Sequence, residues 1–469
     1  MRTEHDFLGE MNVPDNVYYG VQTMRAMENF HITGEHLDPD FIQAMAIVKK
    51  AAALANMETG RLDKKIGNAL VQAASEIIDG QWLDQFPVDP IQGGAGTSVN
   101  MNMNEVLCNR ALEIMGKEKG RYDLISPNNH ANMAQSTNDV FPTSIKVCLS
   151  MKGKRLTAAL KELETELDVK ADEFKDVIKM GRTQLQDAVP ITLGQEMGAY
   201  ASAVARGRKR ISRSLEGVHV INMGGTAIGT GLNAVPGFAK LCAANLSKLT
   251  GENFVSSPNL VEATPDTGAY VSYSGALKRL AVKVSKICND LRLLASGPRC
   301  GLNEINLPPK APGSSIMPGK VNPVIPEVAN QTCFKVIGND TTVTIAAEAG
   351  QLELNVMEPV ITECLFESLW WLSNAINTLT EECILGITVN KERCYEMVKN
   401  SIGIVTALNP YIGYKNSSKI AKEANTTGRS VYDLVLENKL MTKEELDKAL
   451  DPKAMLESHQ FLTNHLSSN

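Results

Sequence analysis

The chain has 469 residues, of which 43% are hydrophobic, 21% charged and 5% aromatic. This length is sufficient for two or three domains that share a large buried core without covalent staples. The formal net charge of -6 provides no basic surface for nucleic acid and argues against a polyanionic partner.

The nine cysteines are scattered along the chain without a CxxC pair, which is typical of reduced core thiols. The N-terminal segment has no apolar signal-peptide core, and no uncharged apolar stretch approaches the roughly 18 residues of a membrane span. We therefore expect a cytoplasmic protein that does not enter a membrane.

Apolar residues at helical spacing predict helices from near the N-terminus onward. Asp38 and Pro39 are typical of an N-cap and a first helical position, and a second helix is expected from Asp63 to Gly80. Longer and shorter helical patterns follow over residues 142–178, 191–220, 268–296, 324–385, 431–440 and 443–450. No run of alternating β-branched residues predicts a strand.

Helical patterns of this length predict a bundle of rods, so the fold class is expected to be all-α. We predict three domains: an N-terminal helical domain over 1–139, a central long-helix bundle over 140–393 and a small C-terminal helical domain over 394–469. Gly and Pro concentrate between the rods, where functional residues are expected.

Two glycine-rich segments precede or join helices. GGAGTSVNMN (93–102) places Thr97 and the first N–H groups of a helix toward whatever binds there, as in anion sites. Because no GK[ST] follows, an ordinary capped loop is the favoured interpretation of this segment taken alone. GGTAIGTG (224–231) lacks the flanking strand and the spacing of a dinucleotide-binding motif, and is interpreted as structural.

Two further segments carry adjacent uncharged polar residues. QSTND (135–139) presents Ser136, Thr137 and Asn138 at the head of the rod over 142–178, which alone is typical of an N-cap. GRTQLQDAVP (181–190) places Thr183 and Gln184 between two rods, which alone is typical of a solvated loop.

GSSIMPGKVNP (313–323) is the most informative segment. Two serines lie in a loop that proline and glycine keep out of regular structure, and Lys320 and Asn322 follow. Packing rarely requires such a loop. A serine nucleophile is an alternative, but no GxSxG or SxxK arrangement with its partners is present, and the seven histidines form no evident triad.

This segment resembles the signature of the aspartase/fumarase superfamily. QSTND, GGAGTS, GRTQLQDA and GGTAIGTGLN occur in the order and spacing of its class II fumarase and aspartase branch, so the resemblance covers essentially the whole chain. It implies an all-α fold with a long central helical bundle and a homotetramer in which three chains contribute to each active site.

Three features are more similar to aspartases than to fumarases. The sequence VIPE (324–327) follows the signature where fumarases usually have a Thr-Gln pair, Ser126 replaces the usual fumarase histidine before Pro-Asn, and Gln184 stands where fumarases have a histidine. The resemblance therefore implies a carbon–nitrogen lyase that reversibly converts L-aspartate to fumarate and ammonia.

Other functions remain open. A class II fumarase would add water to the same product, and a related lyase would act on a substituted aspartate. A catalytically silent structural protein, such as a lens crystallin recruited from this superfamily, is a third alternative. The intact loop serines and Lys320 argue against it, because packing does not demand them.

Elimination of ammonia needs a base and a group of donors around the carboxylate on which charge develops. The resemblance assigns the base to Ser314, and Gln184 cannot serve because an amide has no titratable proton at neutral pH. It assigns substrate binding to Thr97, Ser136, Thr137, Asn138, Thr183, Gln184, Ser315, Lys320 and Asn322. It implies no metal ligands and no required cofactor, and it allows activation by Mg²⁺.

The length of the rod bears on assembly. Ser136–Asn138 and Thr183–Gln184 flank a helical stretch of roughly 40 residues, which is about 60 Å long at 1.5 Å per residue. Gly153 offers one point for a turn, but a single glycine costs a helix only about 1 kcal/mol. We therefore expect an oligomer whose active sites combine residues from several chains.

Overall fold

The computed structural model describes residues 1–451 and 454–455. The chain forms two compact units. Unit 1 comprises Met1–Ala159, Gly207–Val282 and Thr332–Asn374, and unit 2 comprises Leu160–Arg206, Lys283–Gln331 and the chain from Ala375 onward. The predicted domain boundaries after residues 139 and 393 stay predictions.

The long helices confirm the all-α prediction, and each of them contributes residues to both units. They are α5 (Thr137–Glu173), α6 (Leu193–Val218), α9 (Gly268–Leu294), α10 (Val324–Glu348) and α11 (Glu358–Glu382). Gly153 does not interrupt α5. A Cβ atom at Gly153 would lie 2.7 Å from Leu215 Cδ1 and 2.9 Å from the Tyr273 hydroxyl, so this glycine allows close approach of α6 and α9.

The single helical stretch expected over 324–385 is wrong, because α10 and α11 are separate helices. Asn355 lies in the connection between them. Its amide donates to the carbonyls of Ala346 and Ala347, and its Oδ1 accepts the N–H of Met357. One side chain thereby satisfies backbone groups on both sides of the break.

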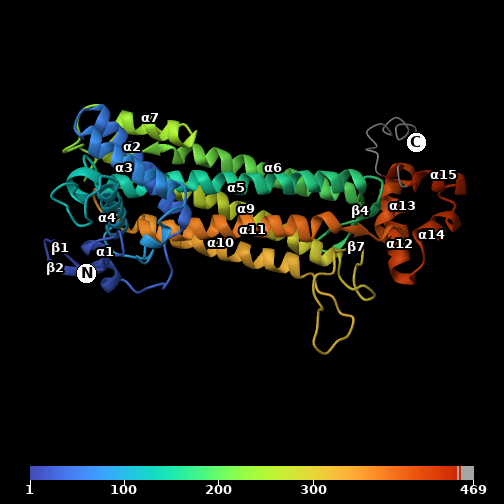
Figure 1. Cartoon of the computed structure of the whole chain (residues 1–469). Helices are drawn as coiled ribbons and strands as arrows, with labels where there is room; N and C mark the ends of the chain where they lie inside the picture. The colour runs from blue at the N-terminus through green and yellow to red at the C-terminus, as the bar shows by residue number, and fades with distance from the viewer. Residues whose placement is uncertain (452–453, 456–469) are drawn as a thin grey trace. The chain divides into compact units, whose positions relative to one another are not determined.

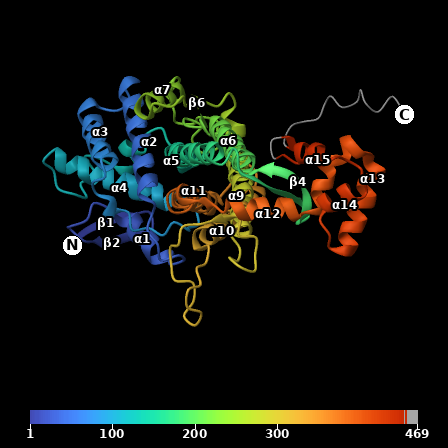
Figure 2. The ribbon, with the colours of Figure 1, turned by 90° about the vertical axis from the view of Figure 1, so that its right-hand side faces the viewer.

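Besides its parts of the long helices, unit 1 contains shorter helices and, near the N-terminus, a pair of strands. These elements are β1 (Arg2–Asp6), β2 (Gly9–Val13), α1 (Val21–Asn29), α2 (Pro39–Glu58), α3 (Lys64–Ile78), α4 (Thr97–Ile114), α7 (Phe238–Thr250) and α8 (Leu260–Ala263). As predicted, Asp38 caps α2 through a side-chain bond to a backbone N–H group. Asp63, where the second helix was expected to begin, caps α3 in the same way. Helix α2 packs against α3 and α7 (Figures 1 and 2).

Unit 2 ends in a group of helices with its own apolar core. The group consists of α12 (Lys391–Asn400), α13 (Val405–Thr427), α14 (Val431–Glu437) and α15 (Lys443–Ala449) (Figure 2). The core includes Leu408, Leu434 and Leu446, and Met180 from strand β3 packs into it. The helices predicted over 431–440 and 443–450 are confirmed as α14 and α15.

Short strands correct the prediction that none would form. Within the described residues they make four two-stranded pairs. Besides β1–β2, these are β3 (Ile178–Thr183) with β4 (Gln186–Thr192), β5 (Val220–Ile221) with β6 (Val255–Ser256), and β7 (Ile305–Asn306) with β8 (Thr388–Val389). Short 3₁₀ helices occupy Leu83–Gln85, Ile384–Gly386 and Ile402–Ile404, and a π-helical turn occupies Pro127–Ala131.

GRTQLQDAVP, which was predicted to lie between two rods, belongs to the β3–β4 hairpin. Gln184 and Leu185 form its turn with φ values of 55° and 61°. Both central residues of such a turn need positive φ, which asparagine and glycine favour, so Gln-Leu gives no sequence signal for it.

The nine cysteines form no disulfide bond with one another. Seven are buried, as expected for core thiols, but Cys364 is partly exposed and Cys300 is exposed. In the described part of the chain, none of the helices combines the length and the apolar character needed to cross a membrane.

Candidate active site

The head of α5 is built around Asp139, a fully buried carboxylate that the sequence analysis did not assign to the site. Its Oδ1 accepts the N–H of Ser136 at 2.9 Å, and its Oδ2 accepts the N–H groups of Gly224 and Thr226 at 3.1 and 3.0 Å. Burial raises the pKa of Asp139 to about 7, while these donors and the charge of Lys49 oppose the rise. The GGTAIGTG segment is thus bound to the head of the helix.

Asn138 is fixed by two hydrogen bonds to that neighbouring segment. Its Nδ2 donates to the Ala227 carbonyl at 2.7 Å, and its own carbonyl accepts Nδ2 of Asn222 at 2.9 Å. Pro142, four residues on in α5, has no N–H to offer this carbonyl, so Asn222 supplies the missing donor. Asn138 can therefore present Oδ1 to a cationic group.

Thr137 is the first residue of α5 and is buried, with 8% of its surface exposed. Its Oγ1 accepts a hydrogen bond from Nδ2 of Asn100, in the first turn of α4, at 3.0 Å. A hydroxyl that accepts from within the protein still has its own proton to donate. Thr137 is therefore suited to bind an anionic oxygen.

Thr97 begins α4, as predicted for the glycine-rich segment. The preceding Gly96 has φ of +87°, and a Cβ atom there would lie 2.2 Å from the Phe141 ring. Thr97 is exposed, and its hydroxyl donates to the Gly94 carbonyl at 2.7 Å. In this geometry the Thr97 hydroxyl is occupied, so binding of an anion by this group requires it to rotate.

In unit 2, the β3–β4 hairpin carries Thr183 and Gln184, and both side chains are exposed. A buried ion-pair cluster anchors the strand beneath them. Glu304, which is 0% exposed, contacts Arg182 at 2.7 Å and Lys179 at 3.0 Å. Glu304 was not among the predicted site residues, and it lies 122 positions from Arg182 in the sequence.

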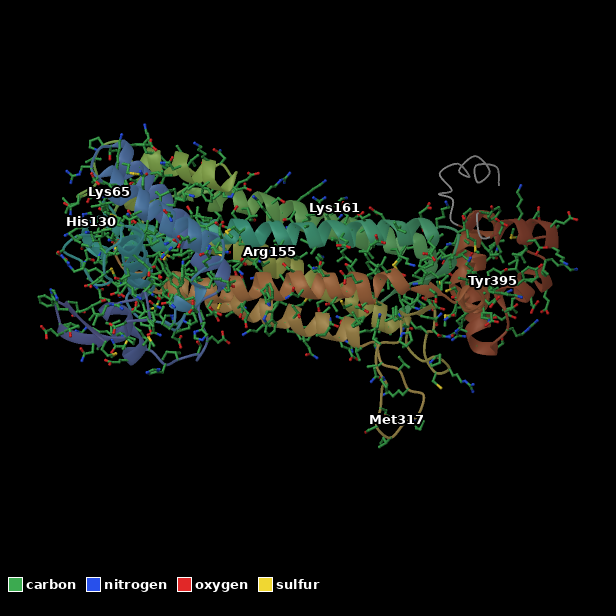
Figure 3. The ribbon with its side chains drawn as sticks, in the orientation of Figure 1. Lys65, His130, Arg155, Lys161, Met317 and Tyr395 are labelled. Carbon is green, nitrogen blue, oxygen red and sulfur yellow. The ribbon has the colours of Figure 1, made fainter. Side chains whose placement is uncertain are left out.

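The loop over 313–322 also belongs to unit 2, and Figure 3 shows Met317 at its projecting tip. Ser314 Oγ accepts the N–H groups of Ile316 and Met317 at 3.1 and 2.9 Å. Two N–H donors aimed at one hydroxyl oxygen stabilise negative charge on it and so favour its deprotonation. This arrangement suits a serine that acts as a base.

Asn322 closes the base of this loop. Its Nδ2 donates to the Gly313 carbonyl at 2.9 Å, and the N–H of Gly313 donates to the Lys320 carbonyl at 2.7 Å. Ser315 and Lys320 are exposed. A cleft of 520 Å³ lies beside the loop and is lined by Arg292, Ser296, Gly319, Lys320, Asn322 and Glu327. Arg292 and Glu327 were not among the predicted site residues.

The predicted site residues fall into two groups. Thr97 and Ser136–Asn138 lie in unit 1, at the heads of α4 and α5. Thr183 and Gln184 on the hairpin, and Ser314, Ser315, Lys320 and Asn322 on the loop, lie in unit 2. Among residues 1–451 and 454–455, no group of three or more His, Cys, Asp or Glu side chains is arranged to hold a metal ion.

Known proteins match the chain over nearly its full length. The family described as Lyase matches residues 9–338, and that described as Fumarase C C-terminus matches residues 404–457. An aspartate ammonia-lyase from Helicobacter pylori is 57% identical over 463 residues, which cover 98% of this chain and 99% of that protein.

Solved structures agree in fold. The crystal structure of fumarate lyase:delta crystallin from Brucella melitensis bound to cobalt matches with a TM-score of 0.95 and 49% identity, over 97% of this chain and 100% of that one. Recombinant class II fumarase from Schistosoma mansoni matches with a TM-score of 0.93 and 36% identity, over 96% and 98%. The chain therefore belongs to the lyase family of the fumarase/aspartase superfamily.

Proposed function

We propose that the protein is a carbon–nitrogen lyase that reversibly deaminates L-aspartate to fumarate and ammonia. The observation that carries this proposal is the 57% identity to an aspartate ammonia-lyase over 98% of the chain. Identity to the class II fumarase structure is lower, at 36%. Gln184 adds chemical support, because its amide can bind an ammonium group but has no titratable proton with which to assist departure of hydroxide.

In the proposed reaction, Ser314 Oγ takes a proton from the carbon next to one carboxylate. The electrons of the C–H bond move into that carboxylate, whose charge doubles, and then form the C=C bond as the C–N bond breaks. Nitrogen leaves with the electron pair of the C–N bond. The two N–H groups that donate to Ser314 Oγ support its role as the base.

Binding roles follow from the chemistry of the remaining groups. Hydroxyls stabilise the carboxylate on which charge develops, and we assign this task to Thr97, Ser136, Thr137 and Ser315. Lys320 and Asn322 suit the other carboxylate, Lys320 as a point charge. The acceptors for the substrate ammonium are Asn138, Thr183 and Gln184.

The proposal includes a homotetramer with active sites shared between chains. Helix α5 has 37 residues and is therefore about 55 Å long, so its two ends cannot contact one small substrate. Exposed apolar residues on α10 and α11 in unit 1 support burial against other copies, among them Phe334 at 59% and Trp370 at 55% exposure.

We also propose that the enzyme requires no cofactor and is located in the cytoplasm. We expect activity without an added cofactor, and assays with EDTA and with added Mg²⁺ measure any activation by the metal. The cytoplasm is the proposed location, since its reducing conditions suit the nine free cysteines.

The test incubates the purified protein with L-aspartate or with L-malate and follows the appearance of fumarate by absorbance. We expect deamination of aspartate and no dehydration of malate at a comparable rate. Comparable turnover of malate would support the fumarase alternative instead. A substituted aspartate as a third substrate identifies a related lyase if it reacts faster than aspartate.

A further inference from the structure

Lys49 on α2 is a buried cation without a carboxylate partner. It is 2% exposed, and its Nζ donates to Asn132 Oδ1 and Gln135 Oε1, each at 3.0 Å. In the part of the chain that the structure describes it makes no ion pair, although Asp139 is a nearby opposite charge. Burial lowers the pKa of Lys49 to about 7. Burial of a charged amine that is bound only by neutral amides costs free energy, so the buried position of Lys49 needs an explanation.

The chemistry of an ammonium group fixes the direction of the hydrogen bonds around it. A protonated lysine can only donate, so Asn132 must present its oxygen to the Lys49 ammonium. The same Oδ1 accepts Nδ2 of Asn100 and Nδ2 of Asn104, each at 3.2 Å. Both of these asparagines must therefore turn their NH₂ groups toward Asn132.

This direction continues to Thr137. The NH₂ group of Asn100 also donates to Thr137 Oγ1 at 3.0 Å. With its oxygen occupied as an acceptor on the inner side, Thr137 has its proton available for another group. If the Asn100 amide were reversed, its carbonyl would face Thr137 and the hydroxyl proton would be donated inward.

Two further contacts agree with this orientation of the amides. Asn132 Nδ2 donates to the Gln135 carbonyl at 3.2 Å, and Asn104 Nδ2 donates to Met101 Sδ at 3.4 Å. Asn100 Oδ1 and Asn104 Oδ1 are buried and have no hydrogen-bond partner among the described residues. Their orientation is therefore not maintained by bonds to their own oxygens. For Asn100 it is maintained from the inner side by the shared Asn132 oxygen, which faces Lys49.

We infer that Lys49 is a positioning residue: its donor-only head orients Asn132 and Asn100 so that Thr137 keeps its hydroxyl proton for a substrate carboxylate. The inference rests on the proposed function, in which Thr137 binds a carboxylate. It adds a group that acts on the substrate only through other side chains.

The first test replaces Lys49 by glutamine, whose amide can donate or accept and so no longer imposes a direction. We expect Lys49→Gln to lower kcat/KM by about 10- to 100-fold, the effect of weakening one hydrogen bond to a charged group. The control is Lys50→Gln, because Lys50 follows Lys49 on α2 but donates to Ser75. This variant is expected to keep wild-type kcat/KM.

A double-mutant cycle with Thr137→Val separates positioning from a general structural role. If Lys49 acts through the Thr137 hydroxyl, Lys49→Gln has little further effect once that hydroxyl is gone. If the full fold-change persists in the Thr137→Val background, the inference is wrong.

A second variant tests the same step without changing Lys49. Asn100→Asp keeps the side-chain shape but replaces the NH₂ donor with an acceptor, so the Thr137 proton is expected to turn inward. We expect a similar loss of kcat/KM, again absent in the Thr137→Val background. Asn102→Asp is the matched control on α4, because Asn102 is also buried but donates to the Gln85 carbonyl. It is expected to lower the melting temperature and leave kcat/KM near wild type.

If the Lys49→Gln protein does not fold, the double-mutant cycle of Asn100→Asp with Thr137→Val is the test that remains. If the effects of these two substitutions on kcat/KM are additive, the inference is wrong. Wild-type turnover of aspartate is measured first, so failure of the proposed function is recognised separately. If the wild-type protein acts on malate instead, the cycles are run with malate, since they require only a substrate carboxylate.

Discussion

At the scale of single residues, the chemistry of the proposed reaction depends on how hydroxyl groups are oriented and what surrounds them. Ser314 receives two backbone N–H groups within its own loop. Thr137 receives the amide of Asn100 from a different helix. The first arrangement is local and favours loss of a proton, whereas the second is long-range and leaves a proton free to be donated.

Ser314→Ala is therefore expected to lower kcat by roughly 10²- to 10⁴-fold, the usual contribution of a general base. Binding of aspartate or of an unreactive analogue should change little, because the base acts only in the transition state. Steady-state kinetics and analogue titration measure the two effects.

Ser315→Ala is the neighbouring comparison. It is expected to lower kcat less than Ser314→Ala does, because Ser315 shares the stabilisation of the developing charge with other hydroxyl residues. Neither change should alter the melting temperature, since the backbone groups of this exposed loop can bond to water. Near-normal turnover by the Ser314→Ala protein would remove this residue from the role of base.

At the scale of elements, the head of α4 depends on glycine at position 96. This residue has positive φ, and the space beside it is filled by the ring of Phe141. Phe141 is 2% exposed and packs edge-on against Phe41, so it cannot move aside easily. The approach of α5 to α4 is thus fixed next to Thr97 and Asn100.

Gly96→Ala is expected to destabilise the protein by roughly 2–5 kcal/mol, because backbone strain and overpacking of the core act together. Gly116→Ala at the other end of α4 is the control. Gly116 also has positive φ, of +71°, but nothing lies within 4 Å of its Cβ position, so only about 1–2 kcal/mol of strain is expected. Thermal denaturation of both proteins compares the two costs, and equal melting temperatures would contradict the role of the Phe141 contact.

At the scale of the whole molecule, the length of α5 separates groups that the proposed reaction needs together. Asn138 lies in its first turn, and Thr183 follows its last residue by ten positions. Closed symmetry among identical chains is the usual way for soluble proteins to form oligomers. A bundle in which copies run antiparallel would bring the head of one α5 beside the tail of another.

Complementation tests shared sites directly. Two inactive proteins, Asn138→Ala and Ser314→Ala, are mixed in equal amounts, dissociated and reassembled. If each site takes these residues from different chains, about one quarter of the sites in random hybrids contain neither defect, and activity returns. Each protein treated alone serves as control. Hybrids that are verified by mass yet stay inactive would show that one chain supplies both residues.

The sequence by itself determined most of the helices, because helical periodicity and capping are local patterns. Asp38 caps the helix that it was expected to cap, the second helix begins after Asp63 as expected, and α5 passes Gly153 without a break. The polar segments at the heads of α4 and α5 and the serine loop were recognised in the sequence as short contiguous motifs. Their residues lie next to one another in the chain, so the motif is visible without the fold.

Only the tertiary structure decided the features that helical periodicity and standard turn and cap residues do not encode. The β3–β4 hairpin has a turn sequence without the usual glycine or asparagine, and Asn355 separates α10 from α11 by bonds that no periodicity reveals. Lys49 stands in an apolar helical run, 83 and 86 positions from the two amides that it binds. A hydrogen bond requires its two atoms to be about 3 Å apart, and only packing of α2 and α4 against the turn before α5 brings these groups to that distance.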